Sequence, residues 1–203
     1  MDGERIKVID LFSGLGGWSA AFKARGHEVF TLDFEPKFNP DLCMDIHEAR
    51  PSDFPPDPDV ILASPPCNCF STASLGHYWV DGRPREHRTL EALAVVMKTL
   101  WLIRKLEPKY WAMENPRGML RTVIGKPDIT TFFASWGVNR YKPTDLWGKL
   151  PRMTWPKPKN WVKSPRGADM GTHGMGPELA AMIPYGLSEA LCQAIENELN
   201  GHS

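Results

Sequence analysis

The sequence lacks the features that mark secreted and membrane-spanning chains. Only four of its 203 residues are cysteine, and they follow no regular spacing, which excludes a disulfide-stapled scaffold. The longest apolar stretch, residues 90–103, is interrupted by Glu91 and Lys98, so it does not predict a membrane span. Charged residues crowd the first five positions, which argues against a signal peptide. With 42% apolar residues, we expect one globular domain over residues 1–203 in a reducing, intracellular compartment such as the cytoplasm.

The chain also lacks a net charge, since 24 basic residues balance 24 acidic ones. The two signs are unevenly distributed: residues 117–166 contain eleven Lys or Arg against two acids. A basic block in an otherwise acidic chain is typical of proteins that bind polyanions such as nucleic acids. The alternative is a solvated surface in which like charges cluster by chance.

Short apolar runs alternate with helical patterns along most of the chain. Their spacing predicts strands and helices as follows: strands at 6–12, 28–32, 60–63 and 110–113, and helices at 18–25, 89–106 and within 177–199. The long helix collects apolar residues on one face: Leu90, Leu93, Ala94, Met97, Leu100 and Trp101. This alternation predicts an α/β fold with a mostly parallel sheet and helices on both faces. Ligands bind beyond the carboxyl ends of the strands in such sheets.

A glycine-rich segment follows the first predicted strand. Residues 10–17 end in the spacing G-x-G-G, which differs from the G-x-G-x-x-G dinucleotide fingerprint. Glycines let the chain turn sharply and let a ligand approach the backbone, although a plain structural turn explains them too. Asp33, at the end of the next predicted strand, suits ribose hydroxyls, and Asp45 suits an adenine amino group. The segment therefore favours a nucleoside-containing cofactor over a bare turn.

Two prolines precede Cys67 where the chain leaves the predicted strand 60–63. Prolines fix the backbone, and a rigidly presented thiolate is a strong nucleophile. The alternatives are an inert buried cysteine and half of a metal site shared with Cys69. Because His77 and His87 lie in a polar loop without a second cysteine pair, we expect no metal.

Glu114 stands at the end of the strand 110–113, where it can face the same pocket as Cys67. A carboxyl group placed there can donate to a ring nitrogen and stabilise charge that develops on the ring. An exposed carboxylate at a loop entrance is the alternative.

Together and in this order, the motifs resemble those of the DNA (cytosine-5) methyltransferases nearly from end to end. Residues 10–17 resemble the family's first cofactor motif, 65–67 its nucleophile motif, 114–116 its E-N-V motif and 183–191 its last motif. The resemblance implies the Rossmann-like α/β fold of S-adenosylmethionine-dependent methyltransferases, with S-adenosylmethionine as cofactor. The residues it implies for that cofactor are Asp10, Phe12, Gly14, Gly16, Gly17, Asp33, Phe34, Asp45, Ile46 and Pro65.

The resemblance also implies a mechanism. Cys67 attacks C6 of a cytosine, C5 takes the methyl group, and Glu114 holds N3 and the exocyclic amine. In duplex DNA the cytosine must first leave the base stack, so the expected partner is duplex DNA, with no membrane and no obligate protein partner. The further residues expected to contact the substrate are Pro66, Asn68, Ser71, Asn115, Arg117, Arg140, Lys142, Lys157 and Lys159.

The chain departs from the family pattern at several positions. Lys142 and Thr144 stand where the family has two arginines, one of which contacts the cytosine carbonyl. Either Lys142 or Arg140 is a candidate for that contact. Two alanines at 180–181 replace a Gly-Asn pair near the methionine end of the cofactor pocket, which leaves the transferred group open. Two milder substitutions are Asn68 for Gln and Pro116 for Val.

A short insert at about 150–174 stands where the family carries a large target-recognition domain. It interleaves basic and aromatic residues, which can bind phosphates and stack on bases, although a Pro-rich surface loop is the alternative. We therefore expect a short or loosely read target, with the loop 70–89 as a lid over the flipped base. The same chemistry on RNA or on a free cytosine nucleotide stays open, as does a non-catalytic accessory subunit that binds cofactor or DNA.

Overall fold

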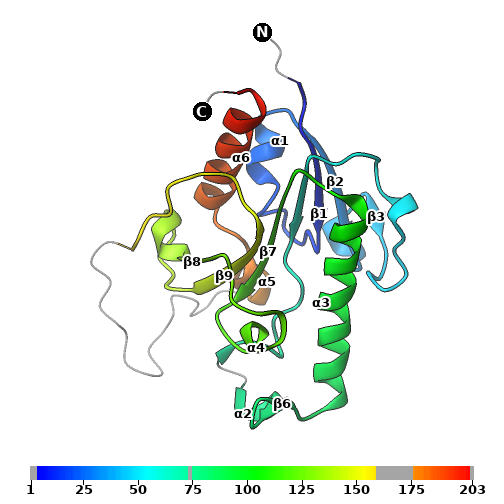
Figure 1. Cartoon of the computed structure of the whole chain (residues 1–203), viewed down its shortest axis with the longest axis vertical. Coiled ribbons are helices and arrows are strands. Elements are labelled where there is room, and N and C mark those ends of the chain that lie inside the picture. The colour runs from blue at the N-terminus through cyan, green and yellow to red at the C-terminus, as the bar shows by residue number, and fades with distance from the viewer. Residues whose placement is uncertain (1–3, 73–74, 159–175, 202–203) are drawn as a thin grey trace.

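The computed structural model describes residues 4–72, 75–158 and 176–201, which form a seven-stranded sheet with helices on both faces (Figure 1). The strand order is β3-β2-β1-β4-β7-β9-β8. These strands are β1 (Lys7–Leu11), β2 (Glu28–Asp33), β3 (Leu42–Cys43), β4 (Val60–Ala63), β7 (Tyr110–Pro116), β8 (Ile129–Phe132) and β9 (Pro143–Lys149). The pairs from β3 to β7 are parallel, whereas β9 runs antiparallel to both β7 and β8. The predicted α/β class and mostly parallel sheet are confirmed.

The predicted helices are present close to their expected positions, and α2 (Leu75–Tyr78) and α4 (Leu120–Ile124) are additional short helices that the sequence did not predict. The others are α1 (Ala20–Ala24), α3 (His87–Leu106), α5 (Pro177–Ala181) and α6 (Tyr185–Leu199). The one closing helix expected within 177–199 is thus two helices, α5 and α6. Three single 3-10 turns are η1 (Pro36–Phe38), η2 (Pro51–Asp53) and η4 (Phe133–Trp136), and a small hairpin pairs β5 (Trp79–Val80) with β6 (Arg83–Pro84). None of the described helices is both long and apolar enough to cross a membrane.

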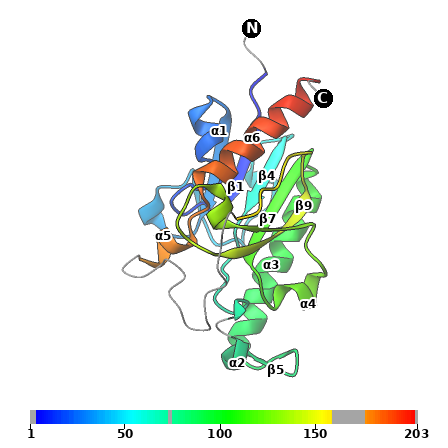
Figure 2. The ribbon, with the colours of Figure 1, turned by 90° about the vertical axis from the view of Figure 1, so that its left-hand side faces the viewer.

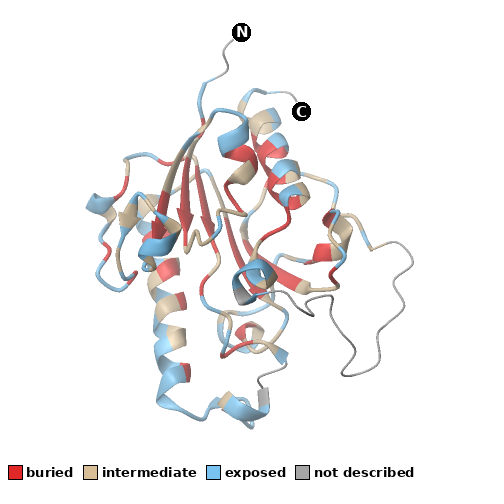
Figure 3. Ribbon diagram, turned by 180° about the vertical axis from the view of Figure 1, so that it is seen from behind, coloured by how far each residue is buried: buried red, intermediate tan, exposed pale blue. Residues whose placement is uncertain are grey.

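Two apolar cores lie on opposite faces of the sheet, because successive side chains of a strand point to opposite sides. Val8, Val60 and Leu62 pack on one side with buried residues of α1 and α6. Ile9 and Ile61 pack on the other side with buried residues of α3. Figure 2 shows α6 crossing in front of the strands with α1 beside it, and Figure 3 shows the buried strands at the centre. The central strands are buried on both faces, as expected of a parallel sheet.

The apolar face that the sequence pattern indicates for α3 packs on the core only in part, through the half-buried Leu93 and Leu100. The buried residues of α3 are Thr89, Val96, Thr99, Leu102 and Ile103. Leu90, Met97 and Trp101 instead point outward, with exposed fractions of 53%, 55% and 42%. The helix therefore has a second apolar face that no other described element covers.

The chain runs outward from β1 to β3 and then returns to place β4 on the other side of β1. The carboxyl ends of β1 and β4 thus form the switch point at which open α/β sheets bind their ligands. Since β9 is antiparallel, its beginning lies at the same edge as the end of β7, where Thr144 pairs with Pro116. Residues from five strands therefore meet at this edge.

Candidate active site

The glycine loop turns the chain from β1 into α1 through an unusual backbone conformation. Phe12 has φ of 61°, and Gly14 and Gly16 have φ of 48° and 75°. Glycine adopts these values without strain, whereas a non-glycine residue such as Phe12 needs neighbouring contacts to hold it. The Asp33 carboxylate holds the loop two residues after Phe12, since it accepts the Gly14 N–H at 2.8 Å, and it also accepts the Glu35 N–H at 3.0 Å. The end of β2 therefore holds the loop that follows β1.

A cavity of about 290 Å³ lies against this loop. The residues that line it are Phe12, Ser13, Gly14, Leu15, Gly17, Trp18, Phe38, Ser64, Glu178, Ala181, Met182 and Ile183. Its walls come from segments that are far apart in the sequence, and they are joined by a hydrogen bond of 2.8 Å from Trp18 Nε1 to Ser64 Oγ. A Cβ on Gly17 would lie 2.8 Å from the Ile183 backbone, so glycine is required where the loop meets the start of α6. The predicted last motif thus packs against the first.

Asp10 is fully buried beneath the glycine loop. Its Oδ2 accepts the Ser19 hydroxyl at 2.6 Å, whereas its Oδ1 is buried without a hydrogen-bond partner. The pKa of Asp10 is raised to about 6, because the effect of burial outweighs the hydrogen bond from Ser19, which acts in the opposite direction. A buried, unsatisfied carboxylate oxygen next to a ligand cavity is a group that a cationic or N–H-bearing ligand can satisfy.

The predicted cofactor residues Phe34, Asp45 and Ile46 are not among the residues that line the cavity. Phe34 follows β2 and is exposed, so its ring is free to cover a flat ligand. Ile46 is buried, whereas the exposed Asp45 accepts the His47 N–H at 2.8 Å and retains a second carboxylate oxygen. The apolar lining, the close-approach glycines and the two buried carboxylates fit a nucleoside-containing cation such as S-adenosylmethionine.

Cys67 follows β4 in a loop that is pinned to the end of β7. The Asn115 side-chain amide donates to the Pro65 carbonyl at 3.0 Å, and the Phe70 N–H donates to the Cys67 carbonyl at 2.9 Å. A Cβ on Gly118 would lie 2.0 Å from the Phe70 carbonyl oxygen, so the loop after β7 packs directly on the cysteine loop. The backbone around Cys67 is therefore held by its neighbours as well as by the two prolines.

The Cys67 thiol lies in the electric field of one carboxylate and one ammonium group. Burial raises its pKa, the charge of Glu114 raises it further, and the charge of Lys142 lowers it. Glu114 is only 4% exposed, and Lys142 Nζ lies 3.3 Å from Glu114 Oε1. The same ammonium lies 4.4 Å from the centre of the Phe133 ring, whose face stabilises a cation. Cys67, Glu114 and Lys142 thus form one electrostatic unit.

Thr144 completes this unit from β9. Its hydroxyl donates to Glu114 Oε1, and Thr144 is fully buried. The sequence singles out Thr144 only as a departure from an expected arginine. Its role depends on the antiparallel register of β7 and β9, in which Thr144 lies diagonally across from Glu114.

Arg140 is not part of the unit, although the sequence predicts it at the substrate. Its guanidinium donates to the Leu179 carbonyl at 2.6 Å and to the Met182 carbonyl at 3.1 Å. Arg140 is 5% exposed, and burial lowers its pKa. These bonds link the chain before β9 to the segment at the end of α5, which forms a wall of the cavity. Of the two candidates for a carbonyl contact, the structure therefore leaves Lys142 nearer to the reacting groups.

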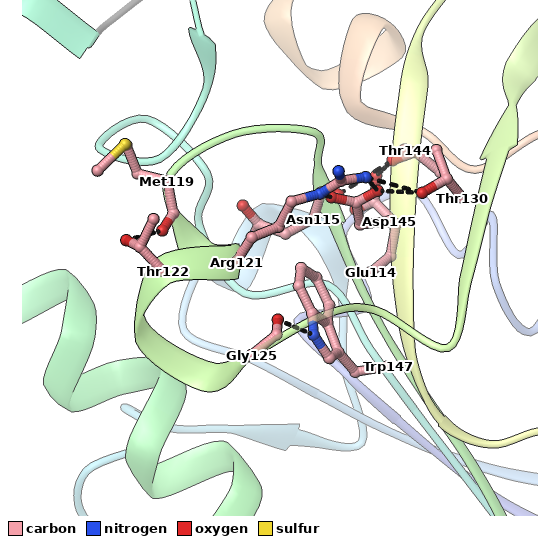
Figure 4. A network of polar contacts seen from close by, with 10 residues as sticks. All are labelled: Glu114, Asn115, Met119, Arg121, Thr122, Gly125, Thr130, Thr144, Asp145 and Trp147. Carbon is pink, nitrogen blue, oxygen red and sulfur yellow. Dashed lines mark hydrogen bonds and ion pairs between the residues drawn. The ribbon is translucent and has the colours of Figure 1, made fainter. Parts of the chain in front are cut away.

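Arg121 and Asp145 of β9 form a second ion pair, which the sequence did not predict (Figure 4). Arg121 from α4 donates to both carboxylate oxygens of the buried Asp145, each at 2.5 Å. Thr130 from β8 donates to Asp145 at 2.8 Å. Because Asp145 pairs with Asn115 across the strands, the network supports the strand end that carries Glu114. Asp145 is one of only two acids in the basic block 117–166. An acid surrounded in sequence by bases is a candidate for an internal ion pair, and this is the signal by which Asp145 could have been found.

The other predicted substrate residues lie at the surface around Cys67. Pro66, Asn68 and Arg117 are exposed, and Ser71 is half-buried and bridged to Gly118. Lys157 is exposed, whereas Lys159 and most of the insert 150–174 lie outside the described residues.

Two tryptophans, Trp155 of the basic insert and Trp79 of the predicted lid, make contacts within the described part of the chain. In the insert, the Trp155 ring contacts Trp136 edge-on at 6.0 Å and packs on the core, so it is not available to stack on a base. In the predicted lid, Trp79 Nε1 donates to the Cys69 carbonyl at 2.6 Å. The hairpin of β5 and β6 is thus attached to the cysteine loop at one point.

Two larger cavities, of about 710 and 560 Å³, lie at the amino ends of the strands. Neither is lined by a predicted catalytic, cofactor or substrate residue, so size alone does not identify the site. One of them borders a cluster in which ligand atoms of His27, Cys192 and Glu196 lie within 4.8 Å of one another. Arg25 already donates to Glu196 at 2.5 Å, and burial raises the pKa of Cys192 to about 12. This cluster is an ion pair beside a protonated thiol.

Comparisons with known proteins identify the family of most of the chain. A family model described as C-5 cytosine-specific DNA methylase matches residues 6–126. The Type II methyltransferase M.HaeII of Haemophilus aegyptius is 33% identical over 121 residues, which cover 55% of this chain and 35% of that protein. The Type II methyltransferase M1.HphI of Haemophilus parahaemolyticus is 30% identical over 151 residues, which cover 65% and 38%. The chain thus spans little more than a third of the length of these relatives.

Among solved structures, the S. pombe Dnmt2 methyltransferase aligns with a TM-score of 0.47 and 17% identity. That alignment covers 71% of this chain and 49% of the other. The Entamoeba histolytica methyltransferase EhMeth aligns with a TM-score of 0.48 and 13% identity, covering 79% and 56%.

Proposed function

Since the chain belongs to the family of C-5 cytosine-specific DNA methylases, we propose that it transfers a methyl group from S-adenosylmethionine to C5 of cytosine in DNA. The described residues act as one catalytic domain in this proposal. The single observation that supports it best is the unit of Cys67, Glu114 and Lys142 beside the cavity at the switch point.

The cavity residues hold the cofactor. Asp33 and Asp45 accept hydrogen bonds from the nucleoside, Phe34 covers the base, and the glycine loop allows close contact with the backbone. S-adenosylmethionine, when bound, supplies an electrophilic methyl group next to the cysteine loop. Asp10 lies beneath the loop, where its unpartnered oxygen favours the positive charge of the ligand.

The reaction begins when the Cys67 sulfur forms a bond to C6 of the flipped cytosine. The electron pair of the C5–C6 double bond then becomes available at C5, which forms its bond to the methyl group. Glu114 holds N3 and the exocyclic amine, so that charge on the ring is stabilised. A base removes the proton from C5, the C5–C6 double bond re-forms and the Cys67 sulfur leaves as a thiolate.

Lys142 replaces the arginine of the family pattern in this proposal. Its ammonium lies at the Glu114 carboxylate, and from there it favours both the thiolate of Cys67 and the carbonyl oxygen of the cytosine. Exposed cations of the basic block, Arg117 and Lys157 among them, contact phosphates of the DNA. Three cations of the block, Arg121, Arg140 and Lys142, instead have internal partners.

Trapping on a duplex that contains 5-fluorocytosine tests the proposal. The fluorine cannot leave as a proton does, so after methyl transfer the enzyme stays bonded to C6. We expect a cofactor-dependent protein–DNA adduct that survives denaturing electrophoresis and is absent in Cys67→Ser. Mass spectrometry of nucleosides from unmodified DNA is expected to show 5-methylcytosine.

The remaining alternatives give different outcomes in the same assays. Product only on tRNA or on dCMP would move the substrate to RNA or to a nucleotide. A product of another mass would identify a different transferred group. Cofactor and DNA binding without any adduct or product would contradict the catalytic proposal and support an accessory role.

A further inference from the structure

The outward face of α3 carries a continuous apolar stripe. Leu90, Ala94, Met97 and Trp101 are all exposed and follow one another at intervals of four, three and four residues. This spacing places them in one row along the helix. The row lies opposite the residues that pack on the sheet, such as Val96 and Ile103. Scattered single apolar residues are ordinary at a surface, whereas an aligned row of large ones marks a contact surface.

We propose that this stripe is the contact surface of a homodimer in which α3 pairs with α3 of a second copy, antiparallel about a twofold axis. A twofold interface requires a surface that is complementary to itself after reversal. The stripe is symmetric in this sense when the twofold axis passes between residues 95 and 96. Reversal there brings Leu90 opposite Trp101 and Ala94 opposite Met97, so that each contact pairs a smaller side chain with a larger one.

The flanks of the stripe are self-complementary about the same point. On one flank, reversal brings Glu91 close to Lys98 of the other copy. On the opposite flank it brings Glu86 close to Arg104 of the other copy. On each flank, an acidic residue of one copy thus lies near a basic residue of the other.

The contacts within one chain leave these charges available. Among the described residues, Glu91 forms one ion pair, an exposed one with His87 at 3.1 Å, and Lys98 lies over the Trp101 ring at 4.6 Å. The helix has 20 residues and is about 30 Å long. The chain has no net charge, so no overall repulsion opposes the association of two copies.

The first test measures the mass of the intact chain by sedimentation velocity across a range of concentrations. We expect a monomer–dimer equilibrium for the wild type. Met97→Glu places a charge at the centre of the stripe and is expected to weaken the dimer at least about 100-fold. Val80→Glu is the matched control, since Val80 is also 50% exposed but lies on the β5 hairpin. It is expected to leave the equilibrium unchanged.

Charge reversal tests the orientation of the helices. Glu91→Lys and Lys98→Glu are each expected to weaken the dimer roughly 3- to 10-fold, because like charges then face each other. The double variant restores the opposite-charge pairs and is expected to return to wild-type affinity. These positions are seven residues apart on one helix, too far for a direct contact within a chain, so rescue reports on the partner.

Circular dichroism of each variant verifies that the fold is intact. A wild type that stays monomeric at several hundred micromolar would overturn the proposal. So would a dimer that Met97→Glu leaves unchanged, or a double charge reversal that fails to restore affinity. A monomer that captures another protein through this face would likewise contradict pairing with a second copy.

Discussion

The hydroxyl of Thr144 is hydrogen-bonded to the carboxylate of Glu114 across the antiparallel pair β7 and β9. The family pattern has an arginine at the position of Thr144, whose long side chain carries a charge. Threonine is short and neutral, so it holds the carboxylate in place but supplies no positive charge. That charge comes from Lys142, two residues earlier and 3.3 Å from the same carboxylate oxygen. Thr144 therefore orients the Glu114 carboxylate, and Lys142 supplies the positive charge beside it.

Removing the Thr144 hydroxyl is expected to impair methyl transfer. In Thr144→Val the Glu114 carboxylate loses its fixed donor and is free to rotate, which we expect to lower the single-turnover rate about 10- to 100-fold. Thr144→Ser keeps the hydroxyl and is expected to restore most of the rate. Equal losses in both variants, with unchanged thermal stability, would show that the hydroxyl does not orient Glu114.

The charge of Lys142 is expected to control the ionisation of Cys67. Since Lys142 lowers the pKa of the thiol, Lys142→Met should shift the pH profile of Cys67 alkylation by iodoacetamide to higher pH. Glu114 raises that pKa, so Glu114→Gln should shift the profile to lower pH. Mass spectrometry of the Cys67 peptide measures both, without DNA or cofactor. Lys149→Met, an exposed site on the same strand, is the control, and a shift there as large as in Lys142→Met would contradict a local effect.

Arg140 is expected to affect the cofactor rather than the cytosine. Arg140→Met removes two hydrogen bonds to the cavity wall at Leu179 and Met182, so we expect binding of S-adenosylhomocysteine to weaken about 10-fold. Titration calorimetry measures this affinity. Arg5→Met, exposed at the other end of the sheet, serves as the control. Unchanged cofactor binding combined with weaker binding of a flipped base would instead place Arg140 at the substrate.

Asp10 is expected to make the unliganded protein less stable as pH rises. Its pKa is about 6 when folded, against an unfolded value of 3.8, so the native state holds the proton more tightly between these values. Stability therefore falls between about pH 4 and pH 6, by roughly 2–3 kcal/mol. Asp10→Asn removes this dependence. Urea denaturation of both proteins at each pH gives the difference, and parallel curves would show that Asp10 titrates normally.

Much of the sheet and half of the site follow from short-range patterns in the sequence. Apolar runs of four to seven residues predicted β1, β2, β4 and β7, and a glycine loop, a proline pair or an acidic residue followed each run. Because parallel strands end at a common edge, the motifs that follow them were expected to meet there. Helical periodicity likewise placed α3 within two residues of its observed start.

The tertiary structure alone decided how the later residues are used. The sequence did not predict that β9 is antiparallel, and that direction brings Lys142 and Thr144 to Glu114 while Arg140 turns toward α5. Contacts between residues about 30 positions apart depend on strand direction and register, which local patterns do not encode. Periodicity similarly shows which residues of α3 share a face, but both of its faces contain apolar residues. Only packing against the sheet selects the face that is buried, and it leaves the row from Leu90 to Trp101 exposed.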